Sequence, residues 1–144
     1  MKPLLVIGLG GPLMGDDGIG GHVAERLAAD PRLPAGVDVI CGGTDLLGCV
    51  GAIEGRERVV VIDAVLDGAE PGTVSPIEDG IEQGQEHAHH LSVTQAVALL
   101  GMTTTARFRL LGVSVAFAGA QPALSPALTA RIPAILDRVL EELR

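Results

Sequence analysis

The chain has 144 residues, which suits one domain rather than two, so we expect a single domain over residues 1–144. Its net charge of −8 leaves no basic face for nucleic acid or an anionic membrane. Hydrophobic residues make up 47% of the chain and Trp and Tyr are absent, so the chain is too apolar to be disordered and has almost no rings to stack on bases or sugars.

Alternating strand-like and helical patterns run through the chain. Short apolar runs predict strands, and apolar residues spaced three and four apart predict helices. In chain order we expect a strand at Leu4–Ile7, a helix from Ile19 to about Ala29, a strand at Val37–Cys41, a short helix at Leu46–Ile53, a strand at Val59–Ile62, a weaker strand at Gly72–Ile77, a loop over 78–88, a helix at Leu91–Leu100, a strand within Arg107–Phe117 and a helix from Ser125-Pro126 to about Leu143.

This order of elements predicts an α/β fold. Alternating strands and helices favour an open sheet with helices on both faces. Val59–Ile62 is wholly apolar, as a central strand should be, whereas Pro76 places its strand near an edge. We therefore expect a three-layer α/β/α arrangement around a mostly parallel, twisted central sheet of about five strands.

The two cysteines and the N-terminal segment bear on the compartment. Cys41 and Cys49 are too few for a disulfide framework, so we expect both thiols to be reduced and buried in a cytoplasmic protein. Gly and Pro interrupt the N-terminal apolar stretch, and two acidic residues follow it, which favours a first strand over a signal peptide. No run approaches the ~20 apolar residues of a membrane span.

Acidic residues follow two of the predicted strands. Sites in open α/β sheets form at the carboxyl ends of the strands. Asp63 ends an apolar strand, where a carboxylate needs a partner, a hydrogen bond or a metal; the alternative is a cap on a nearby helix or loop. Asp16 and Asp17 open the first helix; one of the two should cap it, which leaves the other free to face the cleft.

Three of the four histidines cluster at positions 87, 89 and 90, in an acidic stretch. Imidazole together with two carboxylates could hold nickel or zinc. A solvated His-rich loop is the alternative. His22 on the first predicted helix is interpreted as a surface residue.

Other chemistries fit the chain less well. The segment from Gly8 to Pro12 begins like a dinucleotide-binding loop, but it lacks the third glycine and the second strand does not end in an acidic residue. No Walker motif and no G-x-S-x-G motif is present. A covalent Ser or Cys mechanism is disfavoured, because Cys41 lies in or just after a strand.

The ordered motifs of the chain resemble those of the hydrogenase maturation proteases, over essentially its whole length. The matching segments are Leu5-Val6-Ile7-Gly8, Leu13-Met14-Gly15-Asp16-Asp17-Gly18, Gly42-Gly43-Thr44, Val60-Val61-Ile62-Asp63-Ala64, Pro71-Gly72-Thr73, His89-His90-Leu91, Leu110-Leu111-Gly112-Val113 and Leu124-Ser125-Pro126. The resemblance implies an endopeptidase that removes the C-terminal extension of a nickel-loaded [NiFe] hydrogenase large-subunit precursor.

The resemblance also assigns roles to residues. It implies that Asp17, Asp63 and His89 contact the metal, that Asp17 and Asp63 are catalytic, and that Gly42, Gly43 and Thr44 bind substrate. The metal would be nickel presented by the precursor, which zinc or cadmium could replace in a crystal. The cation either polarises the scissile carbonyl or activates water, or it serves for recognition while a carboxylate acts as general base.

Several functions remain open from the sequence. The precursor is the expected partner, with neither nucleic acid nor membrane, and a monomer is expected. A non-catalytic nickel-checking assembly protein would keep the site without cutting. A Rossmann-like nucleotide-binding protein or a hydrolase of small molecules would use the same fold.

Overall fold

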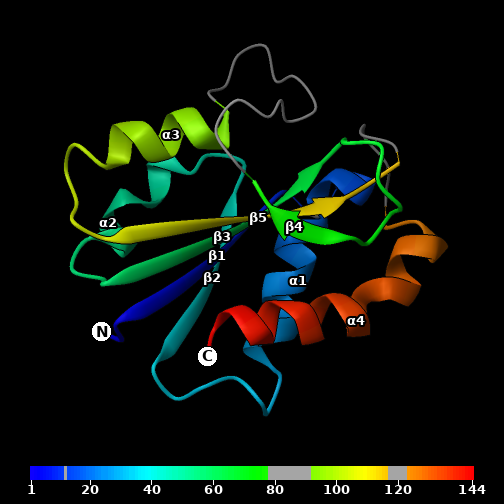
Figure 1. Ribbon diagram of the computed structural model, residues 1–144, viewed down its shortest axis with the longest axis horizontal. Helices are drawn as coiled ribbons and strands as arrows, with labels where there is room; N and C mark the ends of the chain where they lie inside the picture. Colours follow the sequence, from blue (N-terminus) through cyan, green and yellow to red (C-terminus); the bar gives the residue numbers. More distant parts are fainter. Residues whose placement is uncertain (12, 78–91, 117–122) are drawn as a thin grey trace.

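The computed structural model describes residues 1–11, 13–77, 92–116 and 123–144. Its strands and helices alternate as expected for an α/β protein (Figure 1). The elements are β1 (Leu4–Leu9), α1 (Ile19–Ala28), β2 (Val37–Gly43), α2 (Val50–Ile53), β3 (Arg58–Val65), β4 (Val74–Pro76), α3 (Val93–Leu100), β5 (Arg107–Ser114) and α4 (Pro126–Glu142), with short 3₁₀ turns η1 (Gly15–Gly18) and η2 (Leu47–Cys49).

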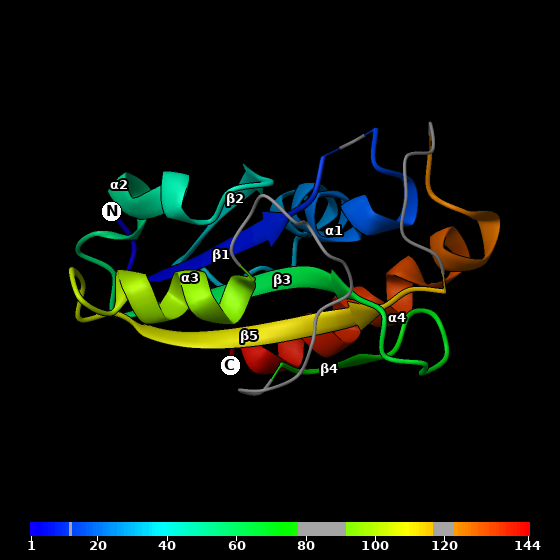
Figure 2. The same cartoon turned by 90° about the horizontal axis from the view of Figure 1, so that it is seen from above.

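The described strands form one five-stranded sheet in the order β2-β1-β3-β5-β4, which Figure 2 shows from one edge to the other. Four strands are parallel, and β4 pairs antiparallel with β5 at the edge. The edge position of Pro76 is confirmed. Because the parallel strands end on the same side, the loops after β1, β2 and β3 meet there.

The core lies in two layers, one on each face of the sheet. Alternate residues of β1 and β3 face α1 and α4 on one side, and the residues between them face α2 and α3 on the other. This alternation follows from the two-residue period of a strand. The three-layer α/β/α prediction is confirmed.

Several element boundaries differ from the sequence expectation. β3 runs on to Val65, so Asp63 lies inside the strand and not at its end; its pairing with β5 continues through Asp63↔Gly112 to Val65↔Ser114. β2 likewise extends through Gly43. The expected helix at Leu46–Ile53 divides into η2 and a four-residue α2. Glycine has low helix propensity, and Gly48 and Gly51 explain this short, irregular segment.

The two later helices begin at side-chain caps. Ser92 and Gln95 form a capping box at α3. At α4 the Ser125 hydroxyl accepts a hydrogen bond from the Leu128 N–H (3.2 Å), and Pro126 occupies the first turn, as the sequence predicted.

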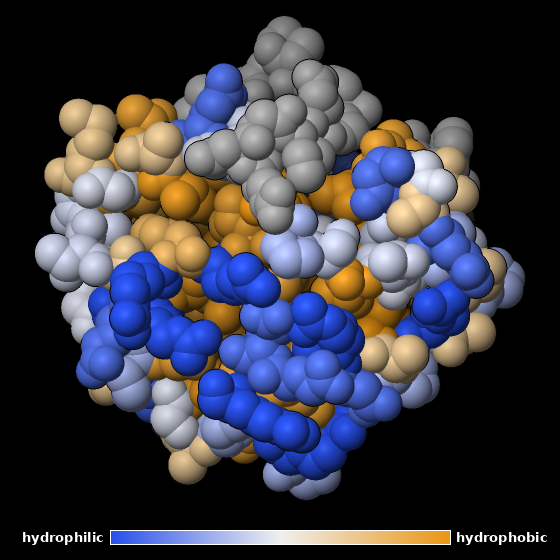
Figure 3. All heavy atoms as spheres, viewed as in Figure 1, coloured by the Kyte–Doolittle hydropathy of each residue, from blue (hydrophilic) through white to orange (hydrophobic). Residues whose placement is uncertain are grey.

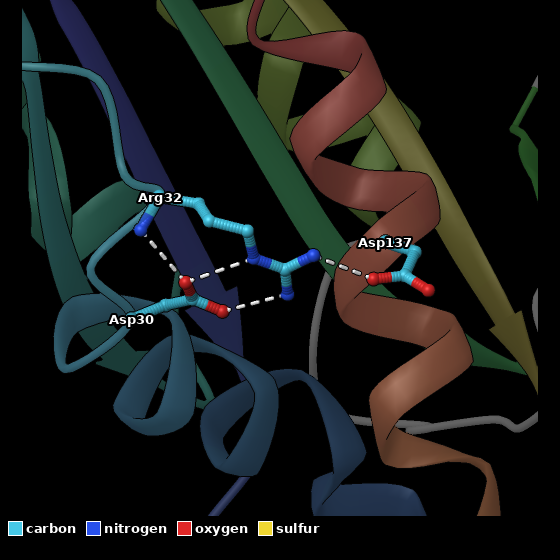
Figure 4. Close-up of polar contacts among 3 residues, drawn as sticks. All are labelled: Asp30, Arg32 and Asp137. Carbon is cyan, nitrogen blue, oxygen red and sulfur yellow. Dashed lines mark hydrogen bonds and ion pairs between the residues drawn. The ribbon is translucent and has the colours of Figure 1, made fainter.

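A charged cluster joins the loop after α1 to α4. Arg32 donates to both oxygens of Asp30 and, at 2.8 Å, to Asp137 on α4 (Figure 4). The Arg32 guanidinium holds the pKa of Asp30 below its usual range. Arg32 and Asp137 are largely exposed, so this cluster fixes the position of the loop more than it stabilises the fold.

The two faces of the sheet are covered unequally. The α3 side leaves Val97, Phe108 and Leu110 only partly buried, and Leu99 and Met102 are exposed. Figure 3 shows apolar side chains over the α3 side and hydrophilic ones gathered over α4. None of the helices in the described ranges is long and apolar enough to cross a membrane.

Glycines allow α1 to pack directly on the backbone of the sheet. A Cβ at Gly20 would collide with the carbonyl oxygens of Leu9 and Ile62, and one at Gly8 would collide with the Gly20 carbonyl. These atoms belong to backbone and cannot rotate away. The close approach places η1, which immediately precedes α1, against β3.

We expect Gly20→Ala to lower the free energy of unfolding by about 1–3 kcal/mol, because α1 must move off the sheet. It should also reduce any activity that depends on η1. Gly51→Ala is the matched control: its Cβ would meet nothing within 4 Å, so alanine should be neutral or stabilising there. Thermal unfolding of both variants measures the difference, and equal melting temperatures would contradict the packing argument.

Candidate functional site

The loops after β1 and β2 touch at the carboxyl edge of the sheet. The Gly10 N–H donates to the Gly43 carbonyl (2.8 Å), and a Cβ at Gly10 would lie 2.6 Å from Gly18 Cα and 2.7 Å from Asp17 O. Gly10 has a φ of 116°, which only glycine adopts readily. Gly10 therefore connects the end of β2 to the acidic turn η1 without a side chain between them.

Asp16 and Asp17 play different parts in η1. Asp16 is buried, and its Oδ1 accepts a hydrogen bond from the Ser125 N–H (2.7 Å) just before α4. The expectation that one of the pair caps α1 is wrong, since neither η1 nor α1 has a side-chain cap. The hydrogen bond of Asp16 instead joins η1 to the segment before α4, which lies 109 positions away in the sequence.

Asp63 is the most perturbed carboxyl group of the site. Its Oδ1 accepts the N–H of the next residue, Ala64 (2.9 Å). Burial raises the pKa of Asp63 to about 7, the Ala64 N–H partly opposes this, and the negative charge of Asp17 raises it further. Although part of the residue reaches solvent, its carboxyl is closely surrounded by protein, so desolvation dominates.

The structure thus brings two of the predicted site residues together. Asp17 lies close enough to influence the ionisation of Asp63, and η1 packs against β3. Gly42, Gly43 and Thr44 lie beside them through the Gly43–Gly10 contact; Gly43 and Thr44 are exposed. Carboxyl groups with perturbed pKa values in such a position are typical of functional sites.

The predicted histidine ligand cannot be placed. His89 and its neighbours His87 and His90 lie outside the described residues. Within the described ranges, no group of three or more His, Cys, Asp or Glu is arranged to hold a metal ion. A carboxyl whose ionised form is disfavoured by burial and by a second carboxylate nevertheless fits a cation, because a positive charge would stabilise both ionised groups.

Two residues differ from the sequence interpretation. Cys41 is exposed, not buried, because it lies on the outermost strand of the sheet; Cys49 is buried as expected, and burial raises the pKa of its thiol. His22 is half-buried and not a surface residue, and its buried Nε2 has no hydrogen-bond partner among the residues that the structure describes. The buried hydroxyl of Ser114 likewise has none there.

Sequence reasoning missed the part played by Gly10 and Gly20, which set the distance between η1 and the sheet. The only available signal was the clustering of glycines around the two acidic residues. The same geometry argues against a phosphate at this loop, because the space next to Gly10 is occupied by Asp17 and Gly18 backbone and two acidic residues follow in η1.

The fold and these acidic residues define an α/β protein. Its carboxylate site lies near the carboxyl ends of the neighbouring strands β1 and β3. Residues 21–142 match the family model described as hydrogenase maturation protease. "Hydrogenase expression/formation protein HupD" of Rhodobacter capsulatus is 32% identical over 149 aligned positions, covering 98% of this chain and 71% of that protein. "Hydrogenase 2 maturation protease" of Escherichia coli is 28% identical, covering 98% and 90%.

A solved structure agrees with these relatives. The hydrogenase maturating endopeptidase HybD from E. coli superimposes with a TM-score of 0.80 and 26% identity, covering all of this chain and 93% of that one. The chain belongs to the hydrogenase maturation protease family. The comparisons support the peptidase interpretation and not the nucleotide-binding alternative.

Proposed function

We propose that this protein is an endopeptidase that removes the C-terminal extension of a nickel-loaded [NiFe] hydrogenase large-subunit precursor. The observation that carries the proposal is the pairing of Asp17 with Asp63 at the carboxyl edge, in a chain of this family. The burial of Asp63, and to a lesser extent the charge of Asp17, raise the pKa of the Asp63 carboxyl to about 7.

Asp63 is the residue we assign to proton transfer. Without a cation the Asp63 carboxyl has a pKa of about 7, and a cation beside it would favour its ionised form, which is the form that accepts a proton. Ionised Asp63 can take a proton from an attacking water and return it to the leaving amine, as a general base and acid of an aspartyl-type endopeptidase does. Cys41 is an unsuitable nucleophile: its Sγ lies 3.6 Å from the Gly21 carbonyl, and the described residues offer it no base.

Nickel enters this proposal as part of the substrate. Asp17, Asp63 and His89 are the residues that would contact the ion carried by the precursor, and zinc or cadmium would occupy the same place. A divalent cation held by these residues would polarise a carbonyl or lower the pKa of water, or it would mark the precursor as loaded. Gly42, Gly43 and Thr44 would lie along the peptide, since Gly43 and Thr44 are exposed beside the acids.

The setting proposed for this reaction is the cytoplasm, with the enzyme acting as a monomer. Both cysteines are free, and an exposed thiol such as Cys41 suits a reducing compartment. Size-exclusion chromatography with light scattering tests the monomer; a stable dimer would contradict it.

A cleavage assay tests the function. The protein is mixed with the hydrogenase large-subunit precursor encoded nearest to it, with and without nickel, and intact mass is measured. Loss of a C-terminal peptide from nickel-loaded precursor alone would support both the endopeptidase and the metal requirement. A complex without cleavage would identify a binding protein instead. If neither a complex nor cleavage were observed, the proposal would be refuted.

The histidine assignment has its own test. We expect His89→Ala to reduce cleavage by about 10²-fold or more, if it contacts the same ion as the two acids. His87→Ala and His90→Ala are the matched controls and should have much smaller effects. Equal losses in all three variants would show that the family motif is aligned with the wrong histidine.

A further inference from the structure

The free edge of β2 is the surface from which we draw a further inference. We propose that the C-terminal extension of the precursor binds as an additional β-strand along this edge, antiparallel to β2, with its first residues crossing Gly42 and Gly43. The inference rests on the proposed function and adds to it the way in which the peptide is held. Strand addition of this kind recognises main-chain groups and so suits a peptide substrate.

β2 has seven residues and, among the strands that the structure describes, pairs on one side only, with β1. The Leu4 N–H donates to Gly36 O, and this bond determines which alternate residues of β2 bond to β1. Alternate residues of a parallel strand bond to opposite sides, so Asp38 and Ile40 face β1, and the N–H and C=O of Val39 and Cys41 face outward. Within the described part of the chain, no hydrogen bond joins the main chain of Val39 or Cys41 to a group outside the sheet.

The outward-facing part of β2 is also accessible and leads into the site. Cys41, Gly43 and Thr44 are exposed. The ladder shifts between Gly8 and Leu9, so that Gly43 replaces Gly42 as the partner of Leu9, and Gly43 then takes a φ of 64°. A Cβ at Gly43 would meet nothing within 4 Å. A peptide can therefore pass from the acid pair over this glycine corner to the edge.

The direction follows from where the reaction takes place. The cleaved bond lies at Asp17 and Asp63, at the carboxyl end of β2, and the extension begins there. An extension that follows the strand from this end runs antiparallel to it. Its terminal carboxylate approaches the amino end of β2, where the Lys2 side chain is half-exposed and lies 3.9 Å from Asp38. The ammonium group of Lys2 complements the negatively charged end of the extension.

The opposite edge of the sheet does not offer the same surface. β4 has only three residues, and one of them is Pro76, which has no N–H to donate. β4 is also separated from the acid pair by β5, whereas β2 reaches η1 through the Gly43–Gly10 hydrogen bond.

Amide hydrogen exchange by NMR tests the inference at single residues. The ¹⁵N-labelled wild-type chain is bound to a nickel-loaded precursor whose scissile peptide bond is replaced by a non-cleavable bond, which keeps the extension attached and the acid pair intact. The matched control is the large subunit that ends at the cleavage point. We expect the Val39 and Cys41 amides to exchange about tenfold or more slowly with the precursor only, as each gains a hydrogen bond. Ile40 and Gly42, already bonded to β1, should change little.

A cleavage assay of the same protein on the unmodified precursor separates the two proposals. Cleavage without slower exchange at Val39 and Cys41, or equal slowing by both forms of the large subunit, would overturn the strand addition and leave the endopeptidase standing. Slowing at all four amides would indicate general shielding and would also overturn it. If neither a complex nor cleavage were observed, the proposed function would be refuted, and the strand addition would be refuted with it.

Discussion

Asp63→Asn should abolish cleavage and at the same time stabilise the fold at neutral pH. Removing a proton-transfer group typically lowers a rate by about 10²–10⁴-fold. Stability should rise because the ionised carboxylate is held where burial and Asp17 disfavour its charge, while asparagine keeps the volume and the hydrogen bond from Ala64 without that charge. We expect a gain on the order of 2–3 kcal/mol.

The pH dependence of this gain is the distinctive result. The folded-state pKa of Asp63 is about 7, above the ~3.9 of an unfolded aspartate, so the folded protein retains a proton that the unfolded chain has lost. Stability of the wild type therefore falls, on account of this residue, as pH rises from about 4 to 7, and the deficit is constant above that. Asp63→Asn should differ little from wild type near pH 4 and most at pH 8.

Urea unfolding at pH 4.5 and pH 8 measures this effect. Asp67→Asn, in the exposed loop after β3, is the control and should show no such pH-dependent gain. A loss of stability in Asp63→Asn at pH 8, or a gain that is the same at both pH values, would contradict the assignment of a raised pKa to this carboxyl.

The adjacent pair Asp16 and Asp17 should separate into a structural and a functional residue. We expect Asp16→Ala to lower the free energy of unfolding by about 1–2 kcal/mol, because the part-buried Ser125 N–H loses its side-chain acceptor. Asp17→Asn should leave stability nearly unchanged and reduce cleavage by about 10²-fold or more. It should also bring the pKa of Asp63 closer to its usual range, because it removes a neighbouring negative charge.

Thermal unfolding and the mass-based cleavage assay distinguish these outcomes. The Asp63 pKa can be followed by NMR of its carboxyl carbon in both backgrounds. If Asp16→Ala proved as stable as wild type while losing activity, the roles of the two residues would be reversed. An unchanged Asp63 pKa in Asp17→Asn would show that the two carboxyl groups do not interact.

Local patterns predicted most of the architecture. The wholly apolar run Val59–Ile62 indicated a strand covered on both faces, and β3 lies inside the sheet with helices on both sides. Pro76 indicated an edge, and Ser125-Pro126 the start of α4, because both depend on a missing or capped N–H within a few residues. Lengths were less well predicted: β3 extends past Asp63 because its partner β5 continues, which no local pattern reports.

Local sequence was enough to establish the α/β class, the acidic residues near the carboxyl ends of the strands and the family, because periodicity, turn residues and ordered motifs are properties of neighbouring positions. The folded chain was needed to tell which of two adjacent aspartates is structural, since the Ser125 N–H that Asp16 binds comes from 109 residues away. It also decided that Cys41 is exposed on an edge strand and that burial beside Asp17 perturbs Asp63. Solvation and charge interactions depend on every group packed nearby, so they appear only once the chain has folded.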